Sequence, residues 1–541
     1  MKNLFCVLVL IQILSCTPSE MTLPNIDISS IEKHMSVLSS DDFLGRMPCT
    51  DGETKTVAYL TKTLKEIGIS PGNGDSYIQD VPLLDINTSM DSDLVIETKS
   101  QKISLHSGKD FVINTERKID ALSLNNSELV FCGYGIVAPE RGWNDYEGMD
   151  MKGKTAVVLV NDPGYGGDDA DFFKGDIMTY YGRWTYKYDE ADRQGADGLL
   201  IIHETSSAGY PWFVVQSSWT GSQQGLAGMD RTNDCGIKGW VSLDAAKKIM
   251  EASGQNLSDL IKKARTPGFK PIPLTATASA SITSKNVECT SKNVIGIIEG
   301  STYPDEYVLY TAHWDHIGVG KVVNGDSIYN GALDNASGTA TVLAIAESFA
   351  ISKKKPKRSV IFLFVTAEEQ GLLGSEYYSE NPIYPLAQTV ANLNMDGVNP
   401  AGLMNDFTIV GMGHSDMDEI SADAAKKQGR YVINEQEPEK GFFFRSDQFN
   451  FAKKGVPVLF GEGGYDHREK GKEYAKKFKE TYTAERYHAP ADEFDPEEWN
   501  FEGMLQDGAL YQDIGLRLAN SQEWPQWKEE SEFRRPKTVK D

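Results

Sequence analysis

Six residues in the C-terminal half of the chain are of the types that bind transition metals or move protons. Two are histidines and four are acids: His313, Asp334, Glu368, Glu369, Asp396 and His488. Two imidazoles and three carboxylates can hold two zinc ions if one carboxylate bridges them, which leaves one acid to act as a base. This set of groups indicates hydrolysis of a peptide bond.

Three of these groups follow apolar runs that predict buried strands. YVLYTA leads into His313, SVIFLFVTA leads into Glu368 and Glu369, and TVANLNM leads into Asp396. From about residue 286 onward, short apolar strands alternate with helices, which is typical of a parallel sheet with helices on both faces. Open α/β sheets bind ligands beyond the carboxyl ends of their strands. We therefore expect an α/β fold with a mostly parallel, twisted sheet that carries the site at this edge.

Asp334 has a different predicted setting. It lies in the turn GALDNASG, just ahead of the predicted helix TATVLAIAESFA. Short polar residues favour helix starts, so Asp334 taken alone would be a helix cap. Taken singly, the other five residues would likewise be structural histidines, solvated charges or turn residues.

Length and charge limit the possible functions. A chain of 541 residues is too long for one ordinary compact core, so two or more domains, or one domain with an insertion, are expected. The 54 Lys and Arg residues face 78 Asp and Glu residues, giving a net charge of −24. This argues against a general phosphate-binding surface and hence against nucleic acid as a partner.

The N-terminus predicts export. Lys2 precedes an apolar run from Leu4 to Leu14 that is short for a membrane span and is typical of a signal peptide. Its ending, Ile-Leu-Ser-Cys16, resembles the bacterial lipoprotein cleavage box, so Cys16 is the expected lipidation site; an ordinary signal peptide cut nearby is the alternative. We expect a location in the bacterial cell envelope, or secretion, with membrane contact only through this anchor.

The other cysteines leave two interpretations open. Cys49, Cys132, Cys235 and Cys289 are widely spaced, which fits neither a zinc ribbon nor a disulfide-dense scaffold. One or two disulfides in an oxidising compartment and buried free thiols are both compatible with this spacing.

Changes in pattern along the chain divide it into sections. Apolar residues recur at the helical period between Val57 and Ile67, whereas residues 118–284 are rich in strand patterns and look inserted. We predict five segments in the following order: a signal peptide at 1–16, a first part of the main domain at 17–117, an insert at 118–284, the main part at 285–520 and a tail at 521–541.

The motifs HWDH, DNASG, AEEQGLLGS, NMDG and YHAPAD together resemble the co-catalytic di-zinc aminopeptidases of clan MH. That superfamily also contains glutamate carboxypeptidase and, in a catalytically dead form, the transferrin receptor. The resemblance covers about residues 26–115 and 286–516. Its opening, LGRMPCTDGE, resembles the N-terminal Gly-Arg signature of the family, with Cys49 where Gly is more usual. The section 118–284 resembles a protease-associated domain.

The resemblance implies a role for each candidate residue. Asp334 would bridge two zinc ions and be followed by a cis peptide bond; His313 and Asp396 would complete one zinc site, and Glu369 and His488 the other. The joint occurrence of all these groups in the family's order favours a metal site over the structural interpretation of each residue taken singly.

The resemblance also implies three roles around the metals. Glu368 would be the general base, which takes a proton from water and passes it to the leaving amine. Asp315 would orient the imidazole of His313. Apart from the resemblance, the neighbouring His316 is expected to support the loop. Tyr487 would stabilise the oxyanion, as in some relatives.

Substrate choice is less determined by the sequence. An aminopeptidase needs acidic groups for the α-amine, and a carboxypeptidase needs cationic groups for a carboxylate. Glu462 would serve the first and Arg445 the second, and Gln448 stands where relatives often have His or Tyr. The triple Phe442–Phe444 would line an apolar pocket or belong to the core.

We therefore predict an exported aminopeptidase that removes N-terminal, apolar residues from peptides. A dipeptidase or carboxypeptidase on the same site, a one-zinc relative such as glutaminyl cyclase, and a surface receptor without turnover are the alternatives. The oligomeric state is left open.

Overall fold

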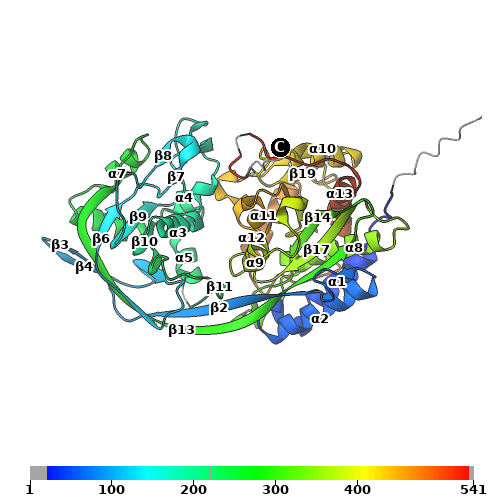
Figure 1. The fold of residues 1–541 in the computed structure, drawn as a ribbon, viewed down its shortest axis with the longest axis horizontal. Helices are drawn as coiled ribbons and strands as arrows, with labels where there is room; N and C mark the ends of the chain where they lie inside the picture. The colour runs from blue at the N-terminus through cyan, green and yellow to red at the C-terminus, as the bar shows by residue number, and fades with distance from the viewer. Residues whose placement is uncertain (1–20, 220, 530, 535–541) are drawn as a thin grey trace, which may run out of the picture.

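The computed structural model describes residues 21–219, 221–529 and 531–534 and folds into two bodies joined by a long arm (Figure 1). The predicted signal peptide and Cys16 lie outside these residues. Within the described ranges, no helix is both long enough and apolar enough to cross a bilayer.

The larger body is built on a mostly parallel sheet, as predicted. Parallel pairs join β17 to β14, β14 to β18 and β18 to β21, whereas β13 and β19 pair antiparallel to their neighbours β17 and β21. Across the sheet the strands follow the order β13 (Ile272–Ile298), β17 (Arg358–Val365), β14 (Tyr303–His313), β18 (Thr389–Asn394), β21 (Val458–Gly463), β19 (Asp406–Ile409) and β20 (Tyr431–Asn434).

Alternate residues of a strand point to opposite sides of the sheet. Both faces of this sheet are apolar, and helices cover both of them. In β14, Val308 and Tyr310 pack in one core cluster, whereas Leu309 packs in another. The first face is covered by α1 (Ile28–Leu38), α2 (Asp51–Glu66), α8 (Ser337–Ala350), α10 (Met417–Lys427) and α13 (Phe501–Asn520), and the second by α9 (Leu373–Glu380) and α11 (Gln448–Lys453). The helix predicted around residues 57–67 is α2, whose start is capped by the side chain of Thr50.

The second body has apolar cores of its own, as expected for a separate domain. Its strands are β3 (Leu94–Thr98), β4 (Lys102–Leu105), β5 (Phe111–Asn114), β6 (Ala121–Phe131), β9 (Lys154–Leu159), β10 (Gly198–Ile202) and β12 (Ile237–Val241), and its helices are α3 (Trp184–Arg193), α4 (Thr205–Ala208), α5 (Trp212–Ser218), α6 (Leu243–Ala252) and α7 (Leu257–Ala264).

The predicted boundary between residues 117 and 118 falls inside this second body. Strand β5 pairs with β12, and Leu94, Ile96 and Phe111 pack in the core of the second body. These strands precede the strand-rich section that marked the predicted insert. Strand β3 also pairs with the nearby β4, but the partners that place β3 and β5 in this body, β13 and β12, lie more than 120 residues later. The local sequence pattern therefore does not assign these strands to a body.

The arm that joins the bodies is made by two long antiparallel strands. Strand β2 (Ile78–Met90) pairs along its whole length with the 27-residue β13, which continues into the sheets of both bodies (Figure 1).

The cysteines divide between both predicted states, because Cys49 and Cys289 form a disulfide, whereas Cys132 and Cys235 are buried free thiols.

Shorter elements complete the chain. The remaining strands are β1 (Ser70–Pro71), β7 (Val137–Ala138), β8 (Trp143–Asn144), β11 (Ser222–Leu226), β15 (Gly318–Val323) and β16 (Asp326–Tyr329), and the remaining α-helix is α12 (Gly471–Glu485). Strands β15 and β16 form a hairpin directly after the HWDH motif.

Candidate metal centre

The predicted ligands come together at the carboxyl edge of the larger sheet. His313 is the last residue of β14, and Asp396 lies two residues after β18. Glu368 and Glu369 follow β17 in a turn, where their side chains diverge toward different partners. The two remaining ligands arrive on other segments: Asp334 from the turn before α8, and His488 from the loop after α12.

The two oxygens of Asp334 face two different imidazoles. Nε2 of His313 lies 3.3 Å from Oδ1 of Asp334, and Nε2 of His488 lies 3.2 Å from Oδ2. This is the position expected of a bridging carboxylate. A cis peptide bond follows Asp334, as the family resemblance implies.

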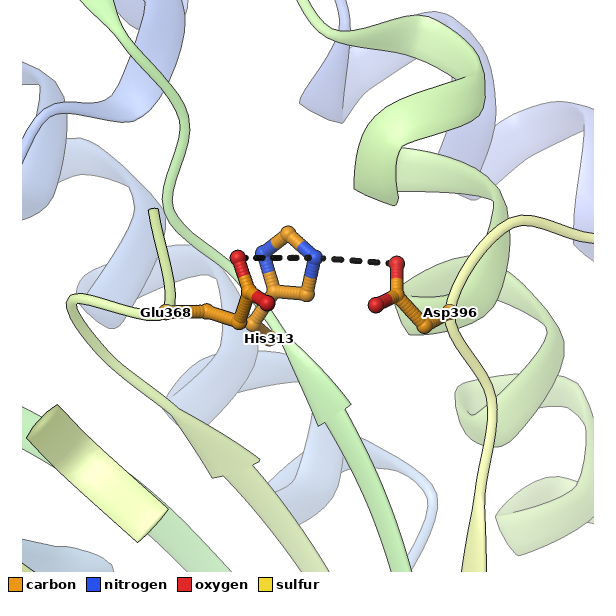
Figure 2. Close-up of side chains that lie close together, drawn as sticks. All are labelled: His313, Glu368 and Asp396. Carbon is orange, nitrogen blue, oxygen red and sulfur yellow. Dashed lines mark hydrogen bonds and ion pairs between the residues drawn. The ribbon is translucent and has the colours of Figure 1, made fainter. Parts of the chain in front are cut away.

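Each imidazole also faces a second carboxylate. Nε2 of His313 lies 3.1 Å from Oδ1 of Asp396, and Nε2 of His488 lies 3.0 Å from Oε2 of Glu369. Figure 2 shows His313 between Asp396 and Glu368, whose Oε2 is 3.9 Å from Nε2.

These separations fit zinc. Ligand atoms bound tetrahedrally at about 2.0 Å stand roughly 3.3 Å from one another, close to the 3.0–3.3 Å observed. The donor set of imidazole nitrogens and carboxylate oxygens is also one that zinc accepts. The residues therefore fit two ions, one on each side of Asp334.

The charges of the site perturb one another strongly. Burial alone would lower the pKa of His313, but the carboxylates of Glu368 and Asp396 raise it well above the ordinary value. Burial would raise the pKa of Asp334, but hydrogen bonds from His313 and His488 hold it well below its usual range. The pKa of Glu368, by contrast, is raised well above the usual value, first by burial and further by the charge of Asp396. Glu368 is thus the acid of the site that most favours holding a proton.

Asp315 contacts the site differently from the family expectation. Its carboxylate accepts hydrogen bonds from the backbone N–H groups of Glu368 (3.1 Å) and Glu369 (3.4 Å). Nδ1 of His313 is 3.2 Å from the backbone oxygen of Asp315 but 3.7 Å from its carboxylate. Burial raises the pKa of Asp315 to about 7.

Three contacts to the ligands were not anticipated from the sequence. Asp492 accepts hydrogen bonds from the backbone N–H groups of Leu333 and Asp334 at 3.1 Å, and thereby holds the turn that carries the bridging residue. Nδ1 of His316 lies 2.5 Å from Oε1 of Glu369, and the hydroxyl of Ser446 donates to Asp396 at 2.5 Å. Asp492 is the last residue of the YHAPAD motif, four residues after His488, so this motif could have identified it from the sequence.

The residues considered for substrate contact have distinct settings. Tyr487 is 49% exposed, and its ring stacks on His488 with 3.9 Å between ring centres. Gln448 is buried and makes hydrogen bonds to Asn394 and to the backbone of Phe443, so its amide is used within the fold. Glu462 forms an ion pair of 2.6 Å with Lys479.

The aromatic triple Phe442–Phe444 divides between core and boundary. Phe443 and Phe444 are buried in the core cluster beneath the second face of the sheet. Tyr180 of the second body packs against Phe444, with ring centres 6.2 Å apart. The plain core interpretation therefore accounts for these two rings.

A second cluster of acids lies in the other body. Glu116, Asp192 and Asp234 have carboxylate oxygens close enough to hold a cation. Lys238, however, donates to Glu116 at 2.7 Å and to Asp192 at 2.8 Å, and Arg231 binds Glu116 at 2.5 Å. Protein cations already occupy the place that a metal would take.

Comparisons with known proteins bear on the larger body. The family model for Peptidase family M28 matches residues 293–512. Aminopeptidase NAALADL1 of Mus musculus is 38% identical over 138 residues, which cover 24% of this chain and 17% of the relative. The probable glutamate carboxypeptidase LAMP1 of Arabidopsis thaliana is 27% identical over 252 residues, which cover 41% of this chain and 34% of the relative. The chain thus spans between a sixth and about a third of the length of these relatives.

Two solved structures align with most of this chain at low sequence identity. The aminopeptidase from Aneurinibacillus sp. strain AM-1 is 18% identical with a TM-score of 0.49, over 95% of this chain and 98% of that chain. BSAP, a zinc aminopeptidase from Bacillus subtilis, is 19% identical with a TM-score of 0.42, over 93% and 97% of the two chains.

Proposed function

We propose that this protein is a zinc-dependent aminopeptidase that removes N-terminal residues from peptides, since residues 293–512 match the model for Peptidase family M28. The observation that carries the proposal is the position of Asp334, whose two oxygens each face one imidazole. One carboxylate between two pairs of ligands supports a centre for two metal ions.

Five side chains would hold the ions. Asp334 would bridge, His313 and Asp396 would complete one site, and Glu369 and His488 the other. When bound, two zinc ions lower the pKa of a shared water toward neutrality and polarise the peptide carbonyl. The contacts of Asp492, His316 and Ser446 with these ligands would fix their orientation.

Glu368 would act as the general base. Its side chain projects beside His313 without a closer ligand role (Figure 2), and its raised pKa suits a group that accepts a proton from water and donates it to the leaving amine. Asp315 would keep this base in place, because its carboxylate binds the N–H of Glu368.

Tyr487 would stabilise the oxyanion that forms as the carbonyl is attacked. Its ring is half-exposed and stacked on His488, so the phenol lies beside the proposed ligands while remaining open to substrate. A hydroxyl donor at this position would stabilise negative charge on oxygen in the transition state.

A dipeptidase or carboxypeptidase on the same site is the second candidate, and one observation favours it. Glu462, a candidate for binding the substrate amine, is already paired with Lys479. Arg445 has no carboxylate partner within ion-pair distance among the described residues, and its charge acts on Tyr487. Its guanidinium donates to the backbone oxygen of Lys440 and lies over the ring of Phe442, and a cation without a carboxylate partner suits a substrate carboxylate.

Export and the role of the second body are further parts of the proposal. A signal peptide with lipidation at Cys16 would place the enzyme in the bacterial envelope, and the Cys49–Cys289 disulfide suits such an oxidising compartment. The second body, with its β-rich cores, would be a protease-associated domain that restricts access to the site. Incorporation of labelled palmitate, lost in Cys16→Ser, tests the anchor.

Hydrolysis of aminoacyl anilides and of N-blocked peptides, with and without added zinc, tests the activity. We expect zinc-dependent release from free-amine substrates only, and we expect Glu368→Gln to lose at least about 10³-fold in kcat while two zinc ions remain bound. Glu380→Gln, which changes an exposed glutamate of α9, is the matched control. Cleavage of blocked peptides would favour the carboxypeptidase, and no turnover by a protein with two bound zinc ions would refute the peptidase proposal.

A further inference from the structure

Arg46 lies beneath the proposed metal centre, and all its side-chain hydrogen bonds within the described part of the chain go to backbone oxygens. The side chain of Arg46 is 1% exposed. Its guanidinium donates to the carbonyls of Leu38 (2.6 Å), Trp314 (2.8 Å), Asn330 (2.6 Å) and Gly331 (2.9 Å). A planar group with five donors can hold several acceptors in one fixed arrangement, which a lysine cannot do.

Three of the four carbonyls bound by Arg46 belong to the two loops that carry His313 and Asp334, and the fourth, Leu38, ends helix α1. Trp314 directly follows His313, whereas Asn330 and Gly331 begin the turn that ends in Asp334. One side chain thus connects the loop of a terminal ligand to the loop of the bridging ligand. The distance between Nε2 of His313 and Oδ1 of Asp334, 3.3 Å, depends on how these two loops are placed.

The charge of Arg46 matches that of the site. Burial lowers its pKa to about 10, and the carboxylates of Asp315, Asp492 and Asp334 oppose that shift. The guanidinium therefore stays charged at neutral pH and partly balances the acids above it.

The segment that carries Arg46 is held in an unfavourable backbone conformation. Leu44, Arg46 and Cys49 all have positive φ, at 51°, 53° and 62°. Such angles are unfavourable for a non-glycine residue, and they persist where the surroundings fix them. At Gly45, an added Cβ would lie 2.5 Å from the backbone oxygen of Tyr329, so the segment also packs tightly against the β15–β16 hairpin.

Covalent and polar contacts anchor the far end of this segment. Cys49 is bonded to Cys289 on β13, and its N–H donates to the carboxylate of Glu53 at 2.5 Å. The same carboxylate accepts from the hydroxyl of Ser291, which also lies on β13. The segment is therefore fixed to β13 near Cys49 and to the two ligand loops at Arg46.

We propose that Arg46 is a positioning residue for the metal centre, and that residues 44–53 form a clasp that holds the loops of His313 and Asp334 at the spacing that zinc requires. This inference rests on the proposed metal site but not on the peptidase activity. The disulfide serves the clasp by keeping its far end in place.

Zinc affinity measured by competition with a chelator tests the proposal. We expect Arg46→Lys to bind zinc about 10–100-fold more weakly than the wild type, the usual effect of losing a contact behind metal ligands. Arg358→Lys is the matched control, because Arg358 is also buried and binds the carbonyls of Leu518 and Glu523, away from the ligand loops. Both variants should unfold at a lower temperature, and only Arg46→Lys should lose zinc affinity.

Two outcomes would overturn the inference. The first is a zinc affinity of Arg46→Lys within twofold of the wild type, with a thermal shift like that of Arg358→Lys. The second is unchanged zinc affinity in the double variant Cys49→Ser/Cys289→Ser. This variant leaves Arg46 intact, so it decides the question if Arg46→Lys does not fold. Weaker zinc binding by this variant supports the clasp, and unchanged binding contradicts it. A wild type that binds two zinc ions but cleaves no peptide would refute the activity and leave this test valid.

Discussion

The two bodies of the molecule each contain a cluster of acids, only partly buried in the second body, and different groups balance the negative charge of each cluster. In the second body, Lys238 and Arg231 contact the carboxylates of Glu116, Asp192 and Asp234 directly. In the larger body, the polar partners of Asp334, Glu369 and Asp396 among the described side chains are imidazoles and a hydroxyl. A cluster of carboxylates therefore does not by itself indicate a metal site. Imidazole nitrogens beside the carboxylates, with no lysine or arginine in contact among the described residues, do indicate one.

The strongest test of this comparison removes the bridging ligand. We expect Asp334→Ala to lower kcat/KM by roughly 10⁴-fold or more, because neither ion would keep its shared ligand. Zinc content, measured by atomic absorption, should fall below two ions per chain. Asp192→Asn, the control in the second body, should retain both ions, and a loss of zinc there would contradict the comparison.

The converse test removes the protein's own cation. Lys238→Met removes a cation from Glu116 and Asp192, although Arg231 still contacts Glu116. Breaking a fully buried ion pair costs about 3–5 kcal/mol, and we expect a smaller loss here because Glu116 is 43% exposed. We expect the denaturation of the second body by urea to shift accordingly, with zinc content and kcat unchanged. An unaltered midpoint would mean that Lys238 is not what balances this cluster.

A smaller effect is expected at the exposed edge of the metal centre. Tyr487→Phe should lower kcat by about 10-fold with little change in KM, because the hydroxyl would act on charge that develops only in the transition state. Tyr431→Phe, at a residue of similar exposure on β20, is the control. Equal kcat values for Tyr487→Phe and the wild type would remove Tyr487 from the mechanism.

The smallest effect concerns Glu435, which lies where the two bodies meet, in a cavity also lined by Ile177 and Met178. Burial raises its pKa from 4.5 to about 7. Between these pH values the folded protein holds a proton that the unfolded chain releases, so the free energy of unfolding should fall as pH rises. Allowing for partial exposure, we expect Glu435→Gln to remove about 1 kcal/mol of this dependence. Identical pH–stability curves for variant and wild type would argue against it.

The sequence identified the residues that come together at the candidate metal centre because each one is marked locally. His313, Glu369 and Asp396 follow apolar strands whose ends must meet at one sheet edge, and the family motifs supply Asp334 and His488. The Arg46 clasp and the assignment of residues 94–114 to the second body depend on contacts between distant parts of the chain. The pairing of Cys49 with Cys289 spans 240 residues and could not be chosen from spacing.

Strand β13 also constrains the order in which the chain can fold. Helix α1 packs against α8, which begins some 300 residues later, and β13 enters the larger sheet only once residues 358–365 are available to pair with it. The strands and helices of the second body, between residues 94 and 282, find their partners within a much shorter stretch. Because closing a long loop costs entropy before any contact compensates it, we expect the second body to form first during synthesis. The apolar faces of α1 and α2 would stay exposed until α8 and residues 358–365 have been synthesised. We therefore expect the N-terminal segment to be the part of the nascent chain with most need of a chaperone.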